Sequence, residues 1–235
     1  MSDIVLDLDV GNSYTKWRAD KQRGRVVTGE LPKLEQSVVR VRVSAVAHSE
    51  HQLSRQIQAT YSVQPEFAKT SQVLSGVRNG YEDITQLGVD RWLALVAAWQ
   101  RVKNDLILFD LGTAMTADYV RADGNHLGGY IVPGLNAMKN ELGQRTRDVQ
   151  VRESDSSFLR SETPATSTVD AVNFGLERVQ LGWLKSCIDV GTQNFGNTPT
   201  LILTGGDLAV NELCQLFHFQ YCPDLVLEGL VIALP

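Results

Sequence analysis

Three glycine-bearing turns, each directly after an apolar run, carry the residue types best suited to chemistry. They are Asp9-Val10-Gly11-Asn12-Ser13, Asp110-Leu111-Gly112-Thr113 and Thr204-Gly205-Gly206-Asp207. Glycine lets a turn bring backbone N–H groups close to a ligand, and such groups bind phosphate oxygens. Nearby hydroxyls add donors, and a leading Asp is a suitable Mg²⁺ ligand, directly or through water. The three turns together predict a nucleoside triphosphate held between two lobes.

The first two turns resemble each other and stand 101 residues apart, counted from Asp9 to Asp110. Each follows an apolar run, reads Asp-x-Gly, and has a Thr four places after the Gly. This repeat predicts two similar lobes, residues 1–105 and 106–235, each opening with a β-hairpin. Chance similarity is the alternative, because strand–Asp–Gly–strand is a common hairpin pattern.

The elements that must position these turns alternate between strand-like and helix-like segments, which predicts an α/β fold. Besides the hairpins, we expect strands over 25–28, 41–46, 128–132 and 201–204, and helices over 50–61, 89–102 and 171–190. The residues expected on one buried face are Leu53 and Ile57 in the first helix; Val89, Trp92, Leu93, Val96 and Trp99 in the second; and Val172, Leu176, Val179 and Trp183 in the third. Segment 148–168, rich in Ser, Thr and charge, is expected to be a mobile loop or an interface segment.

Composition disfavours several classes of partner. The 235 residues include 22 Lys+Arg and 27 Asp+Glu, a net charge of −5, so strong non-specific binding to nucleic acid is not expected. No apolar run approaches the 18 residues or so of a membrane span, and the N-terminal residues lack the cationic region of a signal peptide. Three cysteines without metal-type spacing favour a reduced, cytoplasmic chain.

Other common catalytic motifs do not occur in the sequence. It contains no G-x-x-x-x-G-K-[ST], G-x-G-x-x-G, G-x-S-x-G or H-E-x-x-H. His48 and His51 are one helical turn apart, but no third metal ligand is suggested. His126 and His218 are isolated, and we expect structural roles for both.

Five segments of the chain, taken in order, form a specific pattern. They are Asp9-x-Gly11-Asn12-Ser13-x-x-Lys16, Gly88-Val89-Asp90-Arg91-Trp92, Asp110-x-Gly112-Thr113-Ala114-x-Thr116, Gly128-Gly129-x-Ile131-x-Pro133-Gly134 and Leu203-Thr204-Gly205-Gly206. This pattern resembles that of the type III pantothenate kinases. That family belongs to the actin, hexokinase and chaperone-ATPase superfamily, so the resemblance implies an actin-like ATPase fold of two duplicated RNase H-like lobes with mixed sheets flanked by helices. Ser13 stands where the family usually has Thr, and it keeps the hydroxyl.

The resemblance implies ATP-dependent phosphorylation of pantothenate to 4′-phosphopantothenate, the first step of coenzyme A biosynthesis. Asp90 would be the general base, and Arg91 would meet the pantothenate carboxylate. Gly88, Val89 and Tyr81 would also contact the substrate. Thr168 would reach it across the interface of a homodimer.

The resemblance also assigns the ATP and metal sites. Asp9 would orient Mg²⁺, and Asp110 would hold a monovalent cation, K⁺ or NH₄⁺. The ATP-binding residues would be Asp9, Val10, Gly11, Asn12, Ser13, Tyr14, Thr15, Lys16, Thr113, Gly205 and Gly206.

Each assignment has a structural alternative. Asp9 would cap a turn, Asp90 would stabilise a helix N-terminus, Arg91 would form a surface ion pair and Thr168 would be a helix N-cap. Two functional alternatives also stay open. One is a kinase of the same superfamily acting on a sugar or a small carboxylic acid. The other is a non-catalytic nucleotide-binding regulator, like the Bvg accessory factors.

Overall fold

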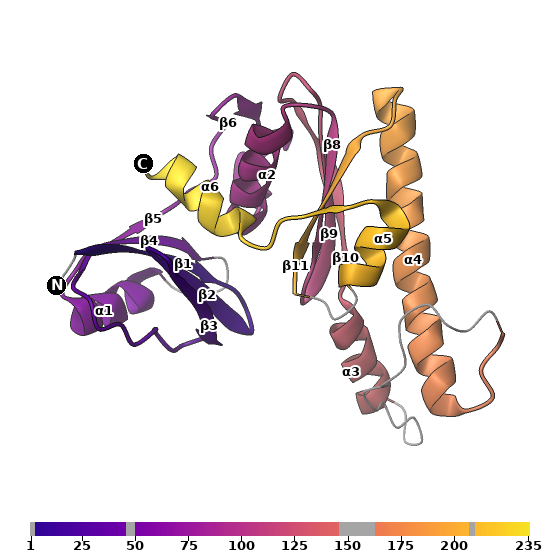
Figure 1. Ribbon diagram of the computed structural model, residues 1–235, viewed down its shortest axis with the longest axis horizontal. Coiled ribbons are helices and arrows are strands. Elements are labelled where there is room, and N and C mark those ends of the chain that lie inside the picture. Colours follow the sequence, from indigo (N-terminus) through magenta and orange to yellow (C-terminus); the bar gives the residue numbers. More distant parts are fainter. Residues whose placement is uncertain (1–2, 46–49, 146–162, 207–209) are drawn as a thin grey trace. The chain divides into compact units, whose positions relative to one another are not determined.

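The computed structural model describes residues 3–45, 50–145, 163–206 and 210–235 (Figure 1). The described residues form two compact units. The first contains the chain up to Lys103 together with Asp123–Leu127 and Asp224–Pro235, and the second contains Asn104–Ala122 and Gly128–Pro223. The chain therefore passes between units near the predicted lobe boundary, but short later segments return to the first unit.

The first unit is built on a mixed five-stranded sheet. The strand order is β3-β2-β1-β4-β5, in which β1, β2 and β3 pair antiparallel while β4 and β5 run parallel to β1. The strands are β1 (Ile4–Val10), β2 (Tyr14–Ala19), β3 (Gln22–Val27), β4 (Val38–Ala45) and β5 (Pro65–Phe67). The remaining elements are α1 (Glu50–Tyr61), β6 (Val73–Leu74), β7 (Val77–Arg78), the 3-10 helix η1 (Ile84–Gln86), α2 (Val89–Val102) and α6 (Leu225–Ala233).

The second unit repeats this arrangement. Its sheet has the order β10-β9-β8-β11-β12, with β9 antiparallel to β8, and β11 and β12 parallel to it. The strands are β8 (Leu106–Leu111), β9 (Ala114–Val120), β10 (His126–Pro133), β11 (Thr200–Gly205) and β12 (Gln220–Tyr221), and the helices are α3 (Leu135–Arg145), α4 (Thr168–Phe195) and α5 (Val210–Phe217). The predicted α/β class, with two similar mixed sheets flanked by helices, is confirmed.

The core of each unit lies between its sheet and a helix. Leu53 and Ile57 of α1 pack on Leu6, Val41 and Val43 of the first sheet, which confirms the narrow apolar stripe predicted for this helix. In the second unit the central strand β8 is buried together with the inner side of α4 (Figure 1). Burial of apolar strands and helix stripes is the main force that holds such layers together.

The helix predicted over 89–102 has these bounds. The residues expected on its buried face are buried apart from Val89, which is half-buried, and the residues on the other sides are buried as well. Every residue from Trp92 to Trp99 is at most 9% exposed. α6 packs on the predicted face, where Val89 and Leu93 form a core cluster with Leu227 and Leu230. The two helices approach closely at Gly229. A Cβ atom there would lie 2.3 Å from the carbonyl oxygen of Leu93, so only glycine fits.

The helix predicted over 171–190 is longer, and the side expected to be buried is only partly right: Leu176 is buried and Trp183 packs on the core, but Val179 is not. Val179 is 51% exposed. The buried line instead passes through two amide side chains as well as apolar ones, namely Asn173, Leu176, Gln180, Leu184 and Cys187. Amide side chains hide this line from a search for apolar periodicity. Most of the segment 148–168 lies outside the described residues.

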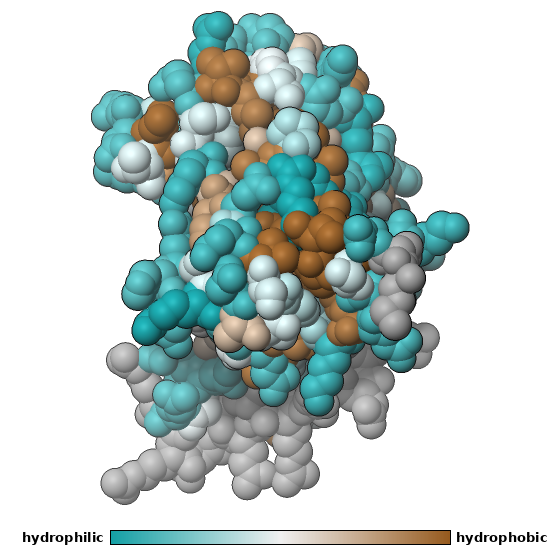
Figure 2. Space-filling view, turned by 90° about the vertical axis from the view of Figure 1, so that its left-hand side faces the viewer, coloured by the Kyte–Doolittle hydropathy of each residue, from teal (hydrophilic) through white to brown (hydrophobic). Residues whose placement is uncertain are grey.

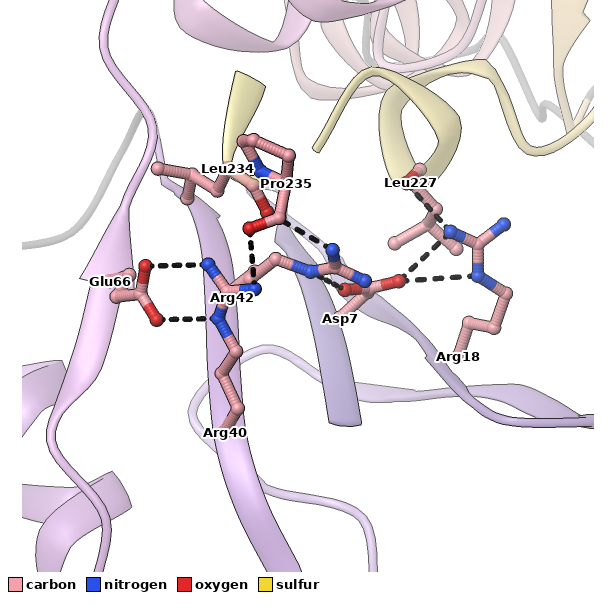
Figure 3. A network of polar contacts seen from close by, with 8 residues as sticks. All are labelled: Asp7, Arg18, Arg40, Arg42, Glu66, Leu227, Leu234 and Pro235. Carbon is pink, nitrogen blue, oxygen red and sulfur yellow. Dashed lines mark hydrogen bonds and ion pairs between the residues drawn. The ribbon is translucent and has the colours of Figure 1, made fainter. Parts of the chain in front are cut away.

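A buried ion network joins α6 to the first sheet (Figure 3). The carboxylate of Asp7, 3% exposed on β1, accepts hydrogen bonds from Arg42 Nε at 2.6 Å and from Arg18 Nη2 at 2.9 Å. The same guanidinium groups donate to α6 and the residue after it, Arg18 to the Leu227 carbonyl and Arg42 to the Leu234 carbonyl. Asp7 therefore orients two arginines that hold the returning segment in place.

The described surface is mixed in character. On the face drawn in Figure 2, hydrophilic residues surround a smaller hydrophobic area. Among the described residues, no helix is long and apolar enough to cross a membrane.

Candidate active site

The first predicted turn joins β1 to β2 at the carboxyl end of β1. The Gly11 N–H donates to the Tyr14 carbonyl at 3.1 Å, and the Gly11 carbonyl accepts from the Thr28 hydroxyl at 2.8 Å. Asn12 and Ser13, between these anchors, are exposed. The hairpin register pairs Asp9 with Lys16, so a carboxylate and an ammonium group stand on neighbouring strands at the same level of the hairpin.

The second and third turns lie together in the second unit. The register pairs Asp110 on β8 with Thr204 on β11, and the Gly206 N–H donates to the Leu111 carbonyl at 3.2 Å. Gly205 has φ +104°, and a Cβ atom there would lie 2.3 Å from the Leu111 oxygen. Only glycine therefore permits the third turn to approach the second one so closely.

The tip of the second turn is also held by backbone contacts. The Gly112 N–H donates to the Ala114 carbonyl at 3.0 Å, and the Gly134 N–H donates to the Thr113 carbonyl at 2.9 Å. Gly112, Thr113 and Ala114 are exposed, so this rigid turn is accessible to a ligand.

Asp90 lies in the first turn of α2, two residues after the N-cap residue Gly88. Its Oδ1 accepts from the Arg91 N–H at 2.7 Å. A Cβ atom on residue 88 would lie 2.6 Å from this same oxygen. Gly88 thus leaves the space that the Asp90 carboxylate occupies, which gives the predicted Gly-x-Asp pattern a physical reason.

Tyr81, Arg91 and His126 form a cluster beside this helix start. Arg91 Nη1 donates to the Tyr81 hydroxyl at 3.0 Å, and its guanidinium carbon lies 5.8 Å from the centre of the Tyr81 ring. Tyr81 also contacts His126. The two rings are stacked, with centroids 5.8 Å apart and planes 12° from parallel. Sequence analysis expected Tyr81 and Arg91 each to contact the substrate, without linking them, and gave His126 a structural role.

The loop between Tyr81 and Gly88 is fixed by Asp83, the N-cap of η1. Its carboxylate accepts from the hydroxyl and the backbone N–H of Thr85, and these hydrogen bonds lower the pKa of Asp83. An ionised carboxylate is the better acceptor at a helix start, so the cap is complete at neutral pH.

Thr168 is the first residue of α4, but it is not the N-cap. That role belongs to Ser167, whose hydroxyl accepts from the Asp170 N–H at 3.2 Å. Thr168 is exposed. The N-cap alternative for Thr168 is therefore wrong, and its hydroxyl is presented on the surface near the start of the helix.

The structure brings the predicted residues together in three groups. Tyr81, Gly88, Asp90 and Arg91 form one, the β1–β2 turn forms the second, and Asp110, Thr113 and Gly205–Gly206 form the third. The last two groups occupy equivalent places, since each turn follows a strand that has a parallel neighbour and lies at its carboxyl end. Ligands of open α/β sheets bind at such ends. Topology and turns thus define a duplicated α/β protein with a glycine-bearing turn at an equivalent place in each unit.

Comparison with known proteins identifies the family. The model of the type III pantothenate kinase family matches residues 5–189. The type III pantothenate kinase of Pseudomonas putida (strain W619) is 36% identical over 251 residues, and that of Ectopseudomonas mendocina (strain ymp) is 37% identical over 249, each match covering 99% of both chains. The chain belongs to the type III pantothenate kinase family, as the sequence motifs indicated.

A solved structure shares the fold. It is that of a conserved Baf family protein from Campylobacter jejuni, with a TM-score of 0.65 and 21% identity, and the match covers 96% of this chain and 95% of that one. At this identity the likeness shows the fold alone.

Proposed function

We propose that this protein transfers the γ-phosphoryl group of ATP to the primary hydroxyl of pantothenate, with Asp90 as the general base. Membership of a family of pantothenate kinases supports the reaction and its place in coenzyme A biosynthesis. The observation that carries the site assignment is the grouping of Asp90, Arg91 and Tyr81 at the start of α2. Asp90 supplies a carboxylate for the pantothenate hydroxyl, and Arg91 supplies a guanidinium for the pantothenate carboxylate.

Asp90 would accept the proton of the attacking hydroxyl. The transition state of phosphoryl transfer is loose in most analyses, so the hydroxyl loses its proton late and a carboxylate is a sufficient base. The space beside Gly88 and the hydrogen bond from the Arg91 N–H restrict the carboxylate to one orientation. Catalysis by this residue would therefore rest on its position.

Arg91 would bind the carboxylate end of pantothenate. Its planar guanidinium suits bidentate hydrogen bonding to a carboxylate. The Tyr81 hydroxyl accepts one donor, on Nη1, and so limits rotation of the guanidinium. Gly88 and Val89, which directly precede Asp90 at the start of α2, would also contact the substrate.

The turns of the two sheets would bind ATP. Backbone N–H groups and hydroxyls of the exposed β1–β2 turn would contact phosphate oxygens, with Lys16 adding positive charge. Thr113 would contribute a hydroxyl from the second turn, and Gly205 and Gly206 would face the adenosine. The full set of ATP-binding residues in the first turn is Asp9, Val10, Gly11, Asn12, Ser13, Tyr14, Thr15 and Lys16.

The metal ions are the finer part of the proposal. Among the described residues there is no cluster of three His, Cys, Asp or Glu side chains suited to a metal. A single carboxylate such as Asp9 fits Mg²⁺ that arrives with ATP, because Mg²⁺ keeps several waters and binds one or two carboxylates plus substrate phosphates. Bound there, it would neutralise phosphate charge. Asp110, opposite Thr116 in the β8–β9 register, would hold K⁺ or NH₄⁺ with carboxylate and hydroxyl oxygens.

Two further parts of the proposal concern the assembly and its location. The exposed Thr168 would contact pantothenate in the partner of a homodimer. The three cysteines, Cys187, Cys214 and Cys222, are free, which is consistent with a reducing compartment and hence the cytoplasm.

The deciding experiment measures ADP release with ATP, Mg²⁺ and pantothenate, with and without K⁺. Pantothenate-dependent ADP and a product with the mass of phosphopantothenate are expected. ADP release only with a sugar or another small acid would replace the substrate, and no turnover with any acceptor would favour a nucleotide-binding regulator.

The general base is tested by Asp90→Asn, which keeps the size of the side chain. We expect kcat to fall by about 10²- to 10⁴-fold, the usual contribution of general-base catalysis. Calorimetry should show pantothenate binding near the parent level. If the variant turned over like the parent, Asp90 would not be the base.

A further inference from the structure

The cluster around Tyr81 contains one member that the family motifs do not assign, His126. It is 3% exposed and begins β10, at the end of a short segment, Asp123–Leu127, that packs within the first unit. Its ring is stacked on Tyr81, and its Nδ1 lies 3.4 Å from the Gly80 N–H, which donates toward it. His126 thus contacts both Tyr81 and the residue before it.

Backbone contacts fix this histidine closely against the segment before Tyr81. The Arg78 N–H donates to the Gly124 carbonyl at 2.9 Å. A Cβ atom on Gly80 would lie 1.9 Å from the His126 carbonyl oxygen, and one on Gly124 would lie 2.1 Å from the Gly76 oxygen. Since both positions admit only glycine, the two segments are held at backbone contact distance and the His126 ring has little freedom.

A second residue restrains the other end of Tyr81. The Tyr81 N–H donates to Asn79 Oδ1 at 3.0 Å, and Asn79 is itself 3% exposed. The backbone of Tyr81 is therefore fixed by Asn79 and its ring by His126, while its hydroxyl is left to accept from Arg91 Nη1.

We infer that His126 is a positioning residue for recognition of the substrate carboxylate. It acts through Tyr81: the stack sets the Tyr81 ring, and the Tyr81 hydroxyl accepts a hydrogen bond from Arg91 Nη1 and so orients the guanidinium. This inference rests on the proposed binding of pantothenate by Arg91. It assigns a substrate-binding function to a residue that lies outside the segment carrying Tyr81, Asp90 and Arg91.

The test compares His126→Ala with His126→Phe and with the matched control Leu127→Ala. Leu127 is the next residue in β10 and is 42% exposed. We expect His126→Ala to raise KM for pantothenate by about threefold to tenfold, the size of one aromatic pair, and to leave kcat and KM for ATP within about twofold. His126→Phe keeps the stack and should restore KM for pantothenate. Leu127→Ala should behave as the parent.

A double-mutant cycle shows whether the effect passes through Tyr81. In a Tyr81→Phe background the acceptor for Arg91 is already lost, so His126→Ala should raise KM much less than in the parent. Equal effects in both backgrounds, or parallel changes of KM for both substrates, would mean that His126 only supports the fold.

A crystal structure of His126→Ala gives a readout that does not depend on the reaction. The Tyr81 ring is expected to leave its position and the Tyr81–Arg91 hydrogen bond to be lost. If that bond persisted at about 3 Å, the positioning role would be refuted even if KM changed. Failure of the parent to bind or phosphorylate pantothenate would instead refute the proposed function, and the crystal structure would still decide whether His126 orients Tyr81.

Discussion

Replacing Asp7 with asparagine tests what holds α6 against the first sheet. The change keeps the shape of the side chain but removes the carboxylate that bridges Arg18 and Arg42 in Figure 3. The side chain of Asp7 is 4% exposed, that of Arg18 25% and that of Arg42 11%. The two guanidinium groups would lose the carboxylate that pairs with both of them.

The size of the effect follows from burial. Asp7 accepts three charged hydrogen bonds, two from Arg18 and one from Arg42. Removing one partner of a buried ion pair costs about 3–5 kcal/mol, because the remaining charge stays desolvated. We expect Asp7→Asn to lower the free energy of unfolding by this amount, a large part of the roughly 5–15 kcal/mol typical of a domain.

The exposed pair formed by Arg40 and Glu66 provides the control. Two hydrogen bonds from Arg40 lower the pKa of Glu66, yet the side chains are 31% and 44% exposed. Exposed ion pairs contribute about 0–1 kcal/mol, so Glu66→Gln should cost less than about 1 kcal/mol. It should become indistinguishable from the parent in high salt, while Asp7→Asn should not.

The assay is urea unfolding followed by tryptophan fluorescence in a Trp183→Phe background. Three of the four tryptophans, Trp17, Trp92 and Trp99, belong to the first unit, so the signal reports that unit. A loss below about 1 kcal/mol for Asp7→Asn would refute the reasoning. The reasoning would also be refuted if Arg42→Met lowered the free energy of unfolding equally in the parent and in the Asp7→Asn background. The effects of substituting two coupled residues should not be additive.

Three further predictions address the second unit. Gly205→Ala places a Cβ atom 2.3 Å from the Leu111 carbonyl oxygen, on a residue with φ +104°. We expect the free energy of unfolding in urea to fall by about 1–3 kcal/mol or more. An unchanged urea midpoint would contradict this prediction. Burial raises the pKa of the Cys187 thiol. A thiol reagent should therefore label the half-buried Cys222 in the folded protein and Cys187 only after unfolding. Labelling of Cys187 in the folded protein would contradict this prediction. Burial also raises the pKa of Glu177 despite Lys139 nearby, so the folded state disfavours the charged form of this carboxyl. Glu177→Gln should therefore raise Tm at pH 7 and not at pH 4. Equal shifts of Tm at the two pH values would contradict this prediction.

Local patterns predicted the parts of the fold that depend on local interactions. The bounds of α1 and α2 match the predicted 50–61 and 89–102, because each helix begins and ends on signals within its own sequence. The strands on either side of the Asp-Gly turns were predicted for the same reason. The role of Gly88 could be inferred as well, since it and Asp90 are only two residues apart.

Elements that depend on distant partners were missed. Leu225–Ala233 is apolar along most of its length, so its pattern does not distinguish a buried helix from a strand, and nothing in it indicates that it packs on α2. Its position depends on Gly229 and on arginines some 190 residues or more earlier in the chain. Such pairings come from tertiary structure and leave no periodic signal.

His126 shows the same limit within the candidate site. Its identity alone favours a structural role, and no motif connects it with Tyr81, 45 residues earlier. The connection arises because Gly80 and Gly124 let two backbones meet, and that contact sets an imidazole against a phenol ring. Of the two glycines, Gly124 already has φ +84°, where alanine is strained in any surroundings, whereas Gly80 is glycine only because His126 is close. Glycine at position 80 is therefore the one sequence signal of this contact, and it becomes readable only once the facing segment is known.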